Sequence, residues 1–117
     1  MEDAWDYNID TQIVLDISEL YKGDLNAIGA DSYVEKVLTE WVYKSFSISE
    51  WEQDDVPIEF TYAGSRVTAS FSFELCDDSK EEAESFVDYC IRTSPFPDGI
   101  RYFNHAREAT ETGADRH

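Results

Sequence analysis

An alternation of apolar and polar side chains runs from Tyr7 to Ile17, with Thr11 and Val14 as exceptions, and it predicts an extended strand. Side chains of a strand point alternately to opposite faces, so a period of two predicts one buried and one solvated face. The positions expected to be buried are the odd ones, Tyr7, Ile9, Thr11, Ile13, Leu15 and Ile17. The even ones, Asn8, Asp10, Gln12, Val14 and Asp16, are expected to face solvent.

Two further alternating segments flank Gly64. The apolar positions before it are Ile58, Phe60 and Tyr62, and those after it are Val67, Ala69, Phe71, Phe73 and Leu75. Alternation on both sides of a glycine-containing turn is typical of a β-hairpin. Pro57, which has no backbone N–H, is tolerated at the first position of its strand. The segment from residue 57 to residue 75 therefore predicts two antiparallel strands.

Two segments carry the three- and four-residue spacing of amphipathic helices. Ser32 and Glu35 have the S-x-x-E spacing of a capping box, and the apolar positions after them extend to about Phe46. A second such box, Ser79 and Glu82, precedes a helix whose expected buried positions are Ala83, Phe86, Val87, Cys90 and Ile91. Ser94 followed by proline is expected to end this second helix.

The predicted order is β-α-β-β-α, with an optional short final strand from Ile100 to Phe103. We therefore expect an α+β two-layer sandwich in which two helices pack on one face of a sheet of three or four strands. With the last strand counted, the order resembles the ferredoxin-like split β-α-β arrangement, which hosts many unrelated functions. We expect residues 1–107 to form one domain and residues 108–117 to be a frayed polar tail.

The charge of the chain is strongly acidic and unevenly placed. Twenty-six Asp and Glu oppose nine Lys and Arg, and residues 1–94 hold 22 of the acids and six of the bases. A disordered acidic chain is poor in aromatic residues, whereas this chain has 15%. Self-repulsion of this size costs stability and indicates either a partner or an environment that tolerates the charge. It also favours a monomer.

Residues suited to catalysis or to holding a metal or cofactor are scarce. The two histidines, His105 and His117, lie near the C-terminal end, and no phosphate loop, nucleophile elbow or zinc-protease motif occurs. The acidic run from Glu50 to Asp55 lacks the glycine and the spacing of an EF-hand loop. Cys76 and Cys90 have no metal-ligand spacing, and Cys90 is expected to be a buried free thiol. We expect no enzyme activity, cofactor or metal.

The acids that a partner would contact form three groups in the predicted elements. On the solvated side of the first strand they are Asp6, Asp10 and Asp16. In the loop after the first helix they are Glu50, Glu52, Asp54 and Asp55, with Trp51 among them as an aromatic anchor or as a lid folded over the core. On the second helix Glu81, Glu84 and Asp88 are expected to form an exposed row.

These features favour a non-enzymatic inhibitor, most simply a DNA mimic. Duplex DNA carries about one charge per 1.7 Å of its axis, and proteins that grip DNA carry clustered Lys and Arg. The expected partner is the basic surface of a histone-like, restriction, CRISPR or repair protein, with no direct binding to nucleic acid. The first alternative is an immunity protein that neutralises a basic nuclease toxin, and a toxin gene immediately upstream would favour it.

The second alternative is an ordinary acidic protein of a salt-loving organism, which the four lysines would fit. The nearly neutral tail argues against it, since such adaptation is expected along the whole chain.

No apolar run approaches the roughly 18 residues of a membrane span, and the acidic start lacks the features of a signal peptide. We therefore expect a soluble cytoplasmic protein of a bacterium or a phage-infected host.

Overall fold

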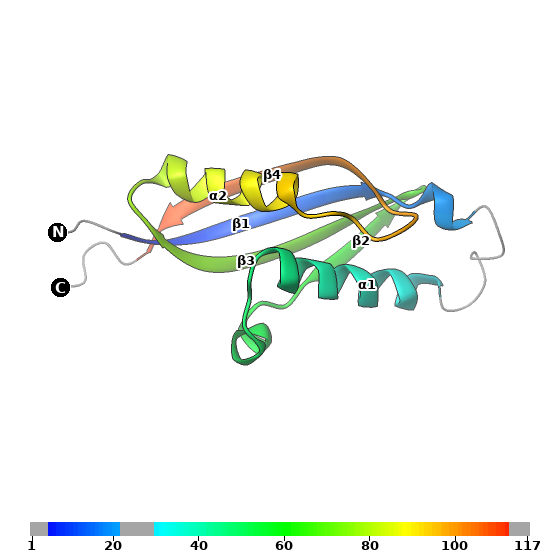
Figure 1. Cartoon of the computed structure of the whole chain (residues 1–117), viewed down its shortest axis with the longest axis horizontal. Coiled ribbons are helices and arrows are strands. Elements are labelled where there is room, and N and C mark those ends of the chain that lie inside the picture. Colours follow the sequence, from blue (N-terminus) through cyan, green and yellow to red (C-terminus); the bar gives the residue numbers. More distant parts are fainter. Residues whose placement is uncertain (1–4, 22–29, 113–117) are drawn as a thin grey trace.

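The computed structural model of the protein describes residues 5–21 and 30–112 (Figure 1). Within these residues, four strands, two helices and two short 3₁₀ turns follow one another. In order they are β1 (Trp5–Asp16), η1 (Ser18–Tyr21), α1 (Ala30–Ser45), η2 (Glu50–Asp55), β2 (Glu59–Ala63), β3 (Arg66–Asp77), α2 (Lys80–Thr93) and β4 (Arg101–Glu111). The predicted element order is confirmed, including the optional last strand.

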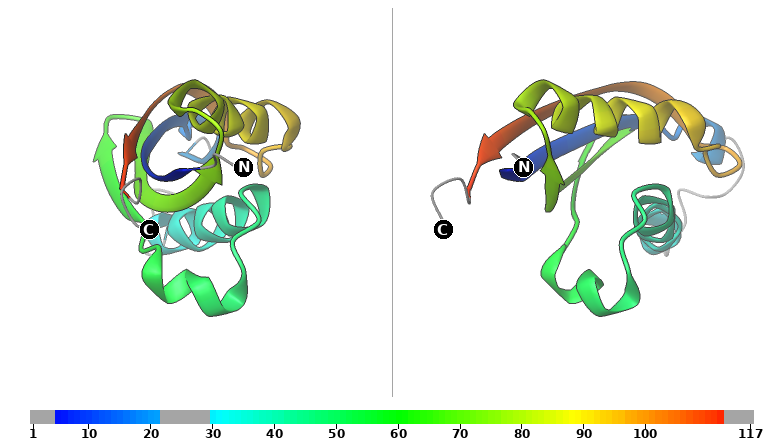
Figure 2. Two further views of the ribbon diagram at one scale, coloured as in Figure 1. Left: turned by 90° about the vertical axis from the view of Figure 1, so that its left-hand side faces the viewer. Right: turned by 60° about the vertical axis from the view of Figure 1, so that its left-hand side comes forward.

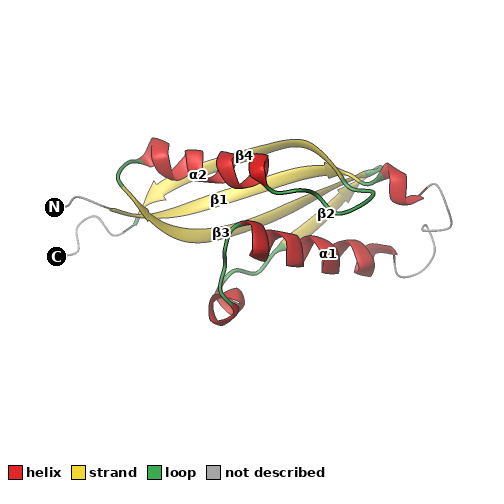
Figure 3. Cartoon of the chain, in the orientation of Figure 1, coloured by secondary structure: helices red, strands yellow, loops and turns green. Residues whose placement is uncertain are grey.

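The four strands form one twisted antiparallel sheet in the order β2-β3-β1-β4. The connection through α1 crosses β3 to reach β2, and the connection through α2 crosses β1 to reach β4. Both helices cover the same face of the sheet, and neither of them covers the other face (Figures 2 and 3). This confirms the two-layer α+β sandwich, and the topology is compatible with the ferredoxin-like arrangement.

The core lies between the sheet and the two helices. All the odd positions from Tyr7 to Ile17 are buried, as the alternation predicts. Phe46, directly after α1, packs its ring edge-on against Phe71 and Phe73 of β3, with centroids 5.3 and 5.5 Å away. Trp41 closes the end of the core, because its indole N–H donates to the carbonyl of Pro95 at 2.9 Å. Both helices and the sheet thus share one aromatic cluster.

Cys76 is exposed and Cys90 is buried, and both are free thiols, as predicted for Cys90. Burial raises the pKa of Cys90 to about 11, so this thiol stays protonated at neutral pH. Among the described residues no helix is long and apolar enough to cross a membrane.

Two local predictions are wrong at the ends of elements. Helix α1 begins at Ala30, two residues before the expected cap Ser32, since the S-x-x-E spacing is equally compatible with a helix interior. Strand β4 is longer than the predicted segment from Ile100 to Phe103 and extends to Glu111. Residues 108–111, expected to fray, instead pair with residues 7–10 of β1. The second capping box is better placed, because the Ser79 hydroxyl accepts the Glu82 backbone N–H at 3.1 Å.

Thr11 is the buried polar exception in β1. Its side chain is 1% exposed, and within the described part of the chain its hydroxyl has no hydrogen-bond partner. An unsatisfied buried hydroxyl costs about 1–3 kcal/mol, whereas Val has nearly the same shape and no hydroxyl. We expect Thr11→Val to raise the free energy of unfolding by about 1 kcal/mol in urea titrations. Thr11→Ser, which keeps the hydroxyl and removes a methyl group, should lower it, and a Val variant less stable than the parent would contradict the prediction.

Candidate acidic binding site

Two adjoining hollows of about 670 and 610 Å³ lie along the sheet, the first on the face that the helices leave open and the second around the edge of β3, between that face and the helix side. The first is lined by polar side chains of three neighbouring strands, among them Gln12, Ser70 and Glu108. The second lies beside β3 and the η2 turn, where Ile48, Phe86 and other apolar residues border it. Asp55 and Ser72 line both hollows, which therefore form one continuous surface.

Six carboxylates are among the residues that line this surface. We call the two hollows together the acidic hollow, and its acids are Asp10, Glu52, Asp55, Glu59, Glu74 and Glu108. Among the described residues that line it, Arg107 is the one cation, and its guanidinium is bound to Asp88 of α2. The hollow is therefore a concave surface of high negative charge density.

Asp10 lines the first of the two hollows. Its carboxylate accepts hydrogen bonds from the Ser72 hydroxyl of β3 and, at 3.3 Å, from the Asn8 amide. On its other side Asp10 lies directly opposite Glu108 of β4 in the antiparallel register. Directly opposed residues have Cβ atoms about 4.5–5.5 Å apart, and like charges there are destabilising. The fold thus holds Asp10 in place beside a second carboxylate.

The other predicted acids of β1 lie away from the acidic hollow. Asp16 ends the strand in register with Arg66 on one side and Arg101 on the other. Hydrogen bonds from the backbone and side chain of Ser18 lower the pKa of Asp16, and the two arginines contribute to the shift. Asp6 lies near the opposite end of the strand and is half-buried. Only Asp10 of this predicted group therefore belongs to the acidic hollow.

The η2 turn supplies Glu52 and Asp55 to the acidic hollow. The turn is fixed at its start by Glu52, whose carboxylate accepts the Ser49 backbone N–H at 3.0 Å. At its end the Tyr43 hydroxyl donates to the carbonyl of Val56 at 2.9 Å. Glu50, Asp54 and Trp51 are exposed, and Trp51 is 81% exposed rather than folded back over the core. Its position suits an interface anchor beside the acidic hollow.

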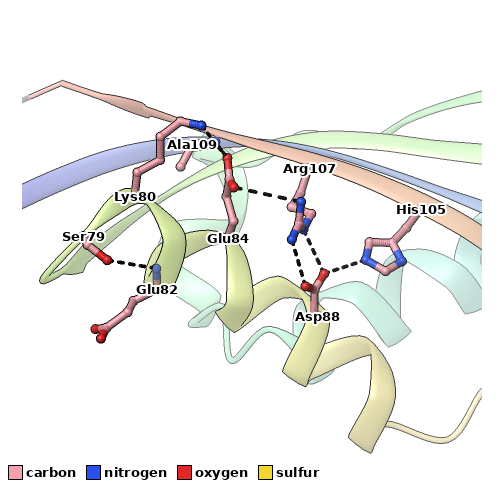
Figure 4. A network of polar contacts seen from close by, with 8 residues as sticks. All are labelled: Ser79, Lys80, Glu82, Glu84, Asp88, His105, Arg107 and Ala109. Atoms are coloured by element: carbon pink, nitrogen blue, oxygen red, sulfur yellow. Dashed lines mark hydrogen bonds and ion pairs between the residues drawn. The ribbon is translucent and has the colours of Figure 1, made fainter.

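The exposed acidic row predicted on α2 is wrong for two of its three members (Figure 4). Glu81 is exposed, but Glu84 and Asp88 point toward β4 and are bound there. The Glu84 carboxylate accepts the Ala109 backbone N–H and a hydrogen bond from Lys80, both at 3.0 Å. The spacing on the helix was correct, but β4 lies against that helix face and supplies the opposite charges.

Asp88 is the centre of a polar network between α2 and β4. The Arg107 guanidinium donates to both of its oxygens, at 2.9 and 3.0 Å. The Nε2 atom of His105 bonds to Asp88 at 2.7 Å, and Nδ1 bonds to the Tyr102 hydroxyl at 2.7 Å. His105 is thus held between two partners in a contact that fastens the edge strand to the helix. Burial opposes ionisation of Asp88, but the bonds from Arg107 and His105 outweigh it and lower the pKa of Asp88.

This lowered pKa gives a testable pH dependence. A carboxylate whose pKa is lower in the folded protein contributes stability above its unfolded pKa, near 3.9, and loses it as the pH falls through the folded value. We expect Asp88→Asn to cost about 1 kcal/mol at pH 7, a value reduced for its partial exposure. The unfolding free energies of parent and variant, measured in urea from pH 7 to pH 2.5, should differ by a constant amount above about pH 5 and approach one another as the pH falls below about 4 toward the lowered pKa of folded Asp88. A constant difference at all pH values would contradict the ionic origin of the contribution.

A separate group of acids lies where β3 leads into α2. Carboxylate oxygens of Asp77, Asp78 and Glu82 lie within 4.8 Å of one another, close enough to share a cation. A hydrogen bond to Asp77 and the Asp77 charge raise the pKa of Glu82. Acids in the first turn also interact favourably with the helix dipole, which accounts for their position without a ligand.

Three acids of the hollow were missed by reading the sequence. Glu59, Glu74 and Glu108 occupy solvent-facing positions of β2, β3 and β4. The alternation in the hairpin already indicated that Glu59 and Glu74 face solvent, since each lies between two apolar residues expected to be buried. Glu108 could not be placed, because the last strand was predicted to end at Phe103.

Comparisons with known protein families, with curated protein sequences and with solved structures found no match.

Proposed function

We propose that this protein is a non-enzymatic acidic binding protein that occupies the basic surface of a nucleic-acid-binding protein, in the manner of a DNA mimic. The observation that carries the proposal is the opposed pair Asp10 and Glu108 on the open face of the sheet. The free protein holds these like charges together at a cost in stability. A Lys or Arg side chain of a partner placed between them converts the repulsion into attraction.

The surroundings of the pair support the same function. Asp55, Glu59 and Glu74 extend the negative charge beyond the pair along the acidic hollow. Serines and Gln12 between the acids add further hydrogen-bonding groups. A concave acidic surface is complementary to a protruding basic segment, and clustered Lys and Arg are the feature by which DNA-binding proteins grip phosphates. Complementary charge also speeds association with such a partner.

Capture from a lysate of the host cell tests the proposal. The immobilised full chain should retain an identified nucleic-acid-binding protein at low salt and release it progressively between about 0.1 and 1 M salt, as the Debye length falls from about 10 to 3 Å. Excess duplex DNA should also release it, because the mimic occupies the DNA site. Retention of a nuclease toxin that DNA does not displace would favour the immunity alternative. Recovery of no nucleic-acid-binding protein or nuclease would overturn the proposal.

A further inference from the structure

The strand β3 has a partner along only half of one side. Strand β2 pairs with residues 66–70 of β3, whereas β1 pairs with the whole strand from Arg66 to Asp77. Among the described residues, no strand and no backbone hydrogen bond from a loop fills the edge from residue 71 to residue 77. We call this segment the free edge of β3.

The turn between β2 and β3 determines which backbone groups the free edge presents. Ala63 and Arg66 flank a two-residue turn that contains Gly64 at φ +63°, so they form the first hydrogen-bonded pair. Hydrogen-bonded and non-bonded pairs then alternate along the ladder. By this alternation the N–H and C=O groups of Ser72, Glu74 and Cys76 point outward from the free edge.

Pro57 explains why β2 does not cover these groups. Extending the register from Glu59 opposite Ser70 would place Pro57 opposite Ser72, which is a hydrogen-bonding position. Proline has no N–H to donate there, and the chain turns away into η2. The free edge is therefore a consequence of the local sequence rather than of a missing strand.

Strand β4, at one outer edge of the sheet, is protected where the free edge of β3 is not. The Glu84 carboxylate of α2 accepts the backbone N–H of Ala109 in β4. A register shift opposite Val14 and Leu15 also interrupts the regularity of β4. Side-chain covers and bulges are the ordinary means by which sheet edges avoid pairing. Within the described part of the sheet, the free edge of β3 lacks both.

The acidic hollow borders the free edge on both sides of the sheet plane. On the open side lie the carboxylates of Glu74, Asp10 and Asp55. On the helix side the second hollow exposes apolar surface of Ile48, Leu75 and Phe86. A strand that pairs here would place alternate side chains against acids and against apolar groups.

We propose that the free edge of β3 binds an extended segment of the basic partner as an added antiparallel strand, with Lys or Arg at every second position and apolar residues between them. The proposal rests on the proposed function, since it specifies how the partner's basic segment is held. Backbone hydrogen bonds to Ser72 and Glu74 provide affinity, and the two sets of side chains provide specificity, as in other cases of strand addition.

A peptide titration of the full chain tests this arrangement. The probe is an acetylated and amidated octapeptide of alternating lysine and valine, measured by calorimetry at low salt. In an antiparallel pair, the lysines opposite Ser72 and Glu74 direct their N–H groups to β3, and the valines direct theirs away. Methylating the lysine amides should weaken binding at least about tenfold, and methylating the valine amides less than about threefold. Equal binding of both methylated peptides, or the reverse preference, would overturn the proposal.

A protein variant provides the matching test. Ser72→Pro removes the outward N–H together with the hydroxyl and leaves the ladder bonds to β1. Ser72→Ala removes only the hydroxyl, which donates a hydrogen bond to Asp10. With folding checked by circular dichroism, the Pro variant should bind the unmethylated peptide at least about tenfold more weakly than the Ala variant. Equal binding by the two variants would overturn the docking at this edge. If salt-sensitive capture from lysate persisted in that case, the proposed function would stand and only the edge docking would fail.

Discussion

Replacement of Phe46 by Ala is expected to lower the free energy of unfolding by about 3–5 kcal/mol. The Phe46 side chain is 4% exposed and contacts rings from three elements. Besides Phe71 and Phe73, its ring lies 6.3 Å from Trp41 of α1 and 6.5 Å from Phe86 of α2. Truncation removes apolar contacts and leaves a cavity where both helices meet the sheet. A loss of this size is a large fraction of the 5–15 kcal/mol typical of a domain.

Urea or thermal unfolding of the purified variant measures this effect. Trp51→Ala is the matched control, because it truncates an even larger aromatic residue whose side chain is 81% exposed on η2. The control should change stability by no more than about 0.5 kcal/mol. A Phe46→Ala cost below about 1 kcal/mol would mean that this ring does not join the helices to the sheet in solution.

The double reversal Asp10→Lys and Asp55→Lys is expected to weaken capture of the basic partner at least about tenfold. Both residues line the acidic hollow, and the change replaces attraction for a partner's cations with repulsion. The two side chains come from β1 and η2, so they test whether the structure brings two sequence-distant acids into one site. Binding at low salt to the partner identified by capture is the measurement.

The double reversal Glu40→Lys and Asp98→Lys is the matched control. It alters the net charge by the same amount at two exposed positions outside the acidic hollow. If binding depends on the hollow, the control should lose much less affinity than Asp10→Lys with Asp55→Lys. Equal losses would mean that net charge alone attracts the partner and that the hollow is not the site.

A single substitution separates binding from stability at the same site. Glu108→Gln relieves the repulsion with Asp10, so it should stabilise the free protein by about 0.2–1 kcal/mol. The same change should weaken partner binding. A gain in stability together with a loss of partner affinity is expected only if the like-charge pair serves to bind a partner. A Glu108→Gln variant that is more stable than the parent and binds the partner equally tightly would contradict this.

Local patterns were sufficient to predict most of the fold. The alternation from Tyr7 to Ile17, the turn at Gly64 and the cap at Ser79 all depend on interactions between near neighbours. The last strand was predicted only as far as Phe103, because β4 is an edge strand with most side chains exposed. An edge strand lacks the clear alternation of a half-buried one, so its polar end looked like a frayed tail.

The sequence by itself determined the elements, their order, the layered class of the fold and the large excess of acid. Only the tertiary structure decided which acids remain available. Glu84 and Asp88 are bound by groups of β4 and are only partly exposed. Strand register places Asp10 beside Glu108, while Asp16 lies between two arginines. The physical reason is the sequence distance over which the interactions act. Periodicity reflects contacts within one element, whereas the charge of a surface depends on groups brought together from distant parts of the chain.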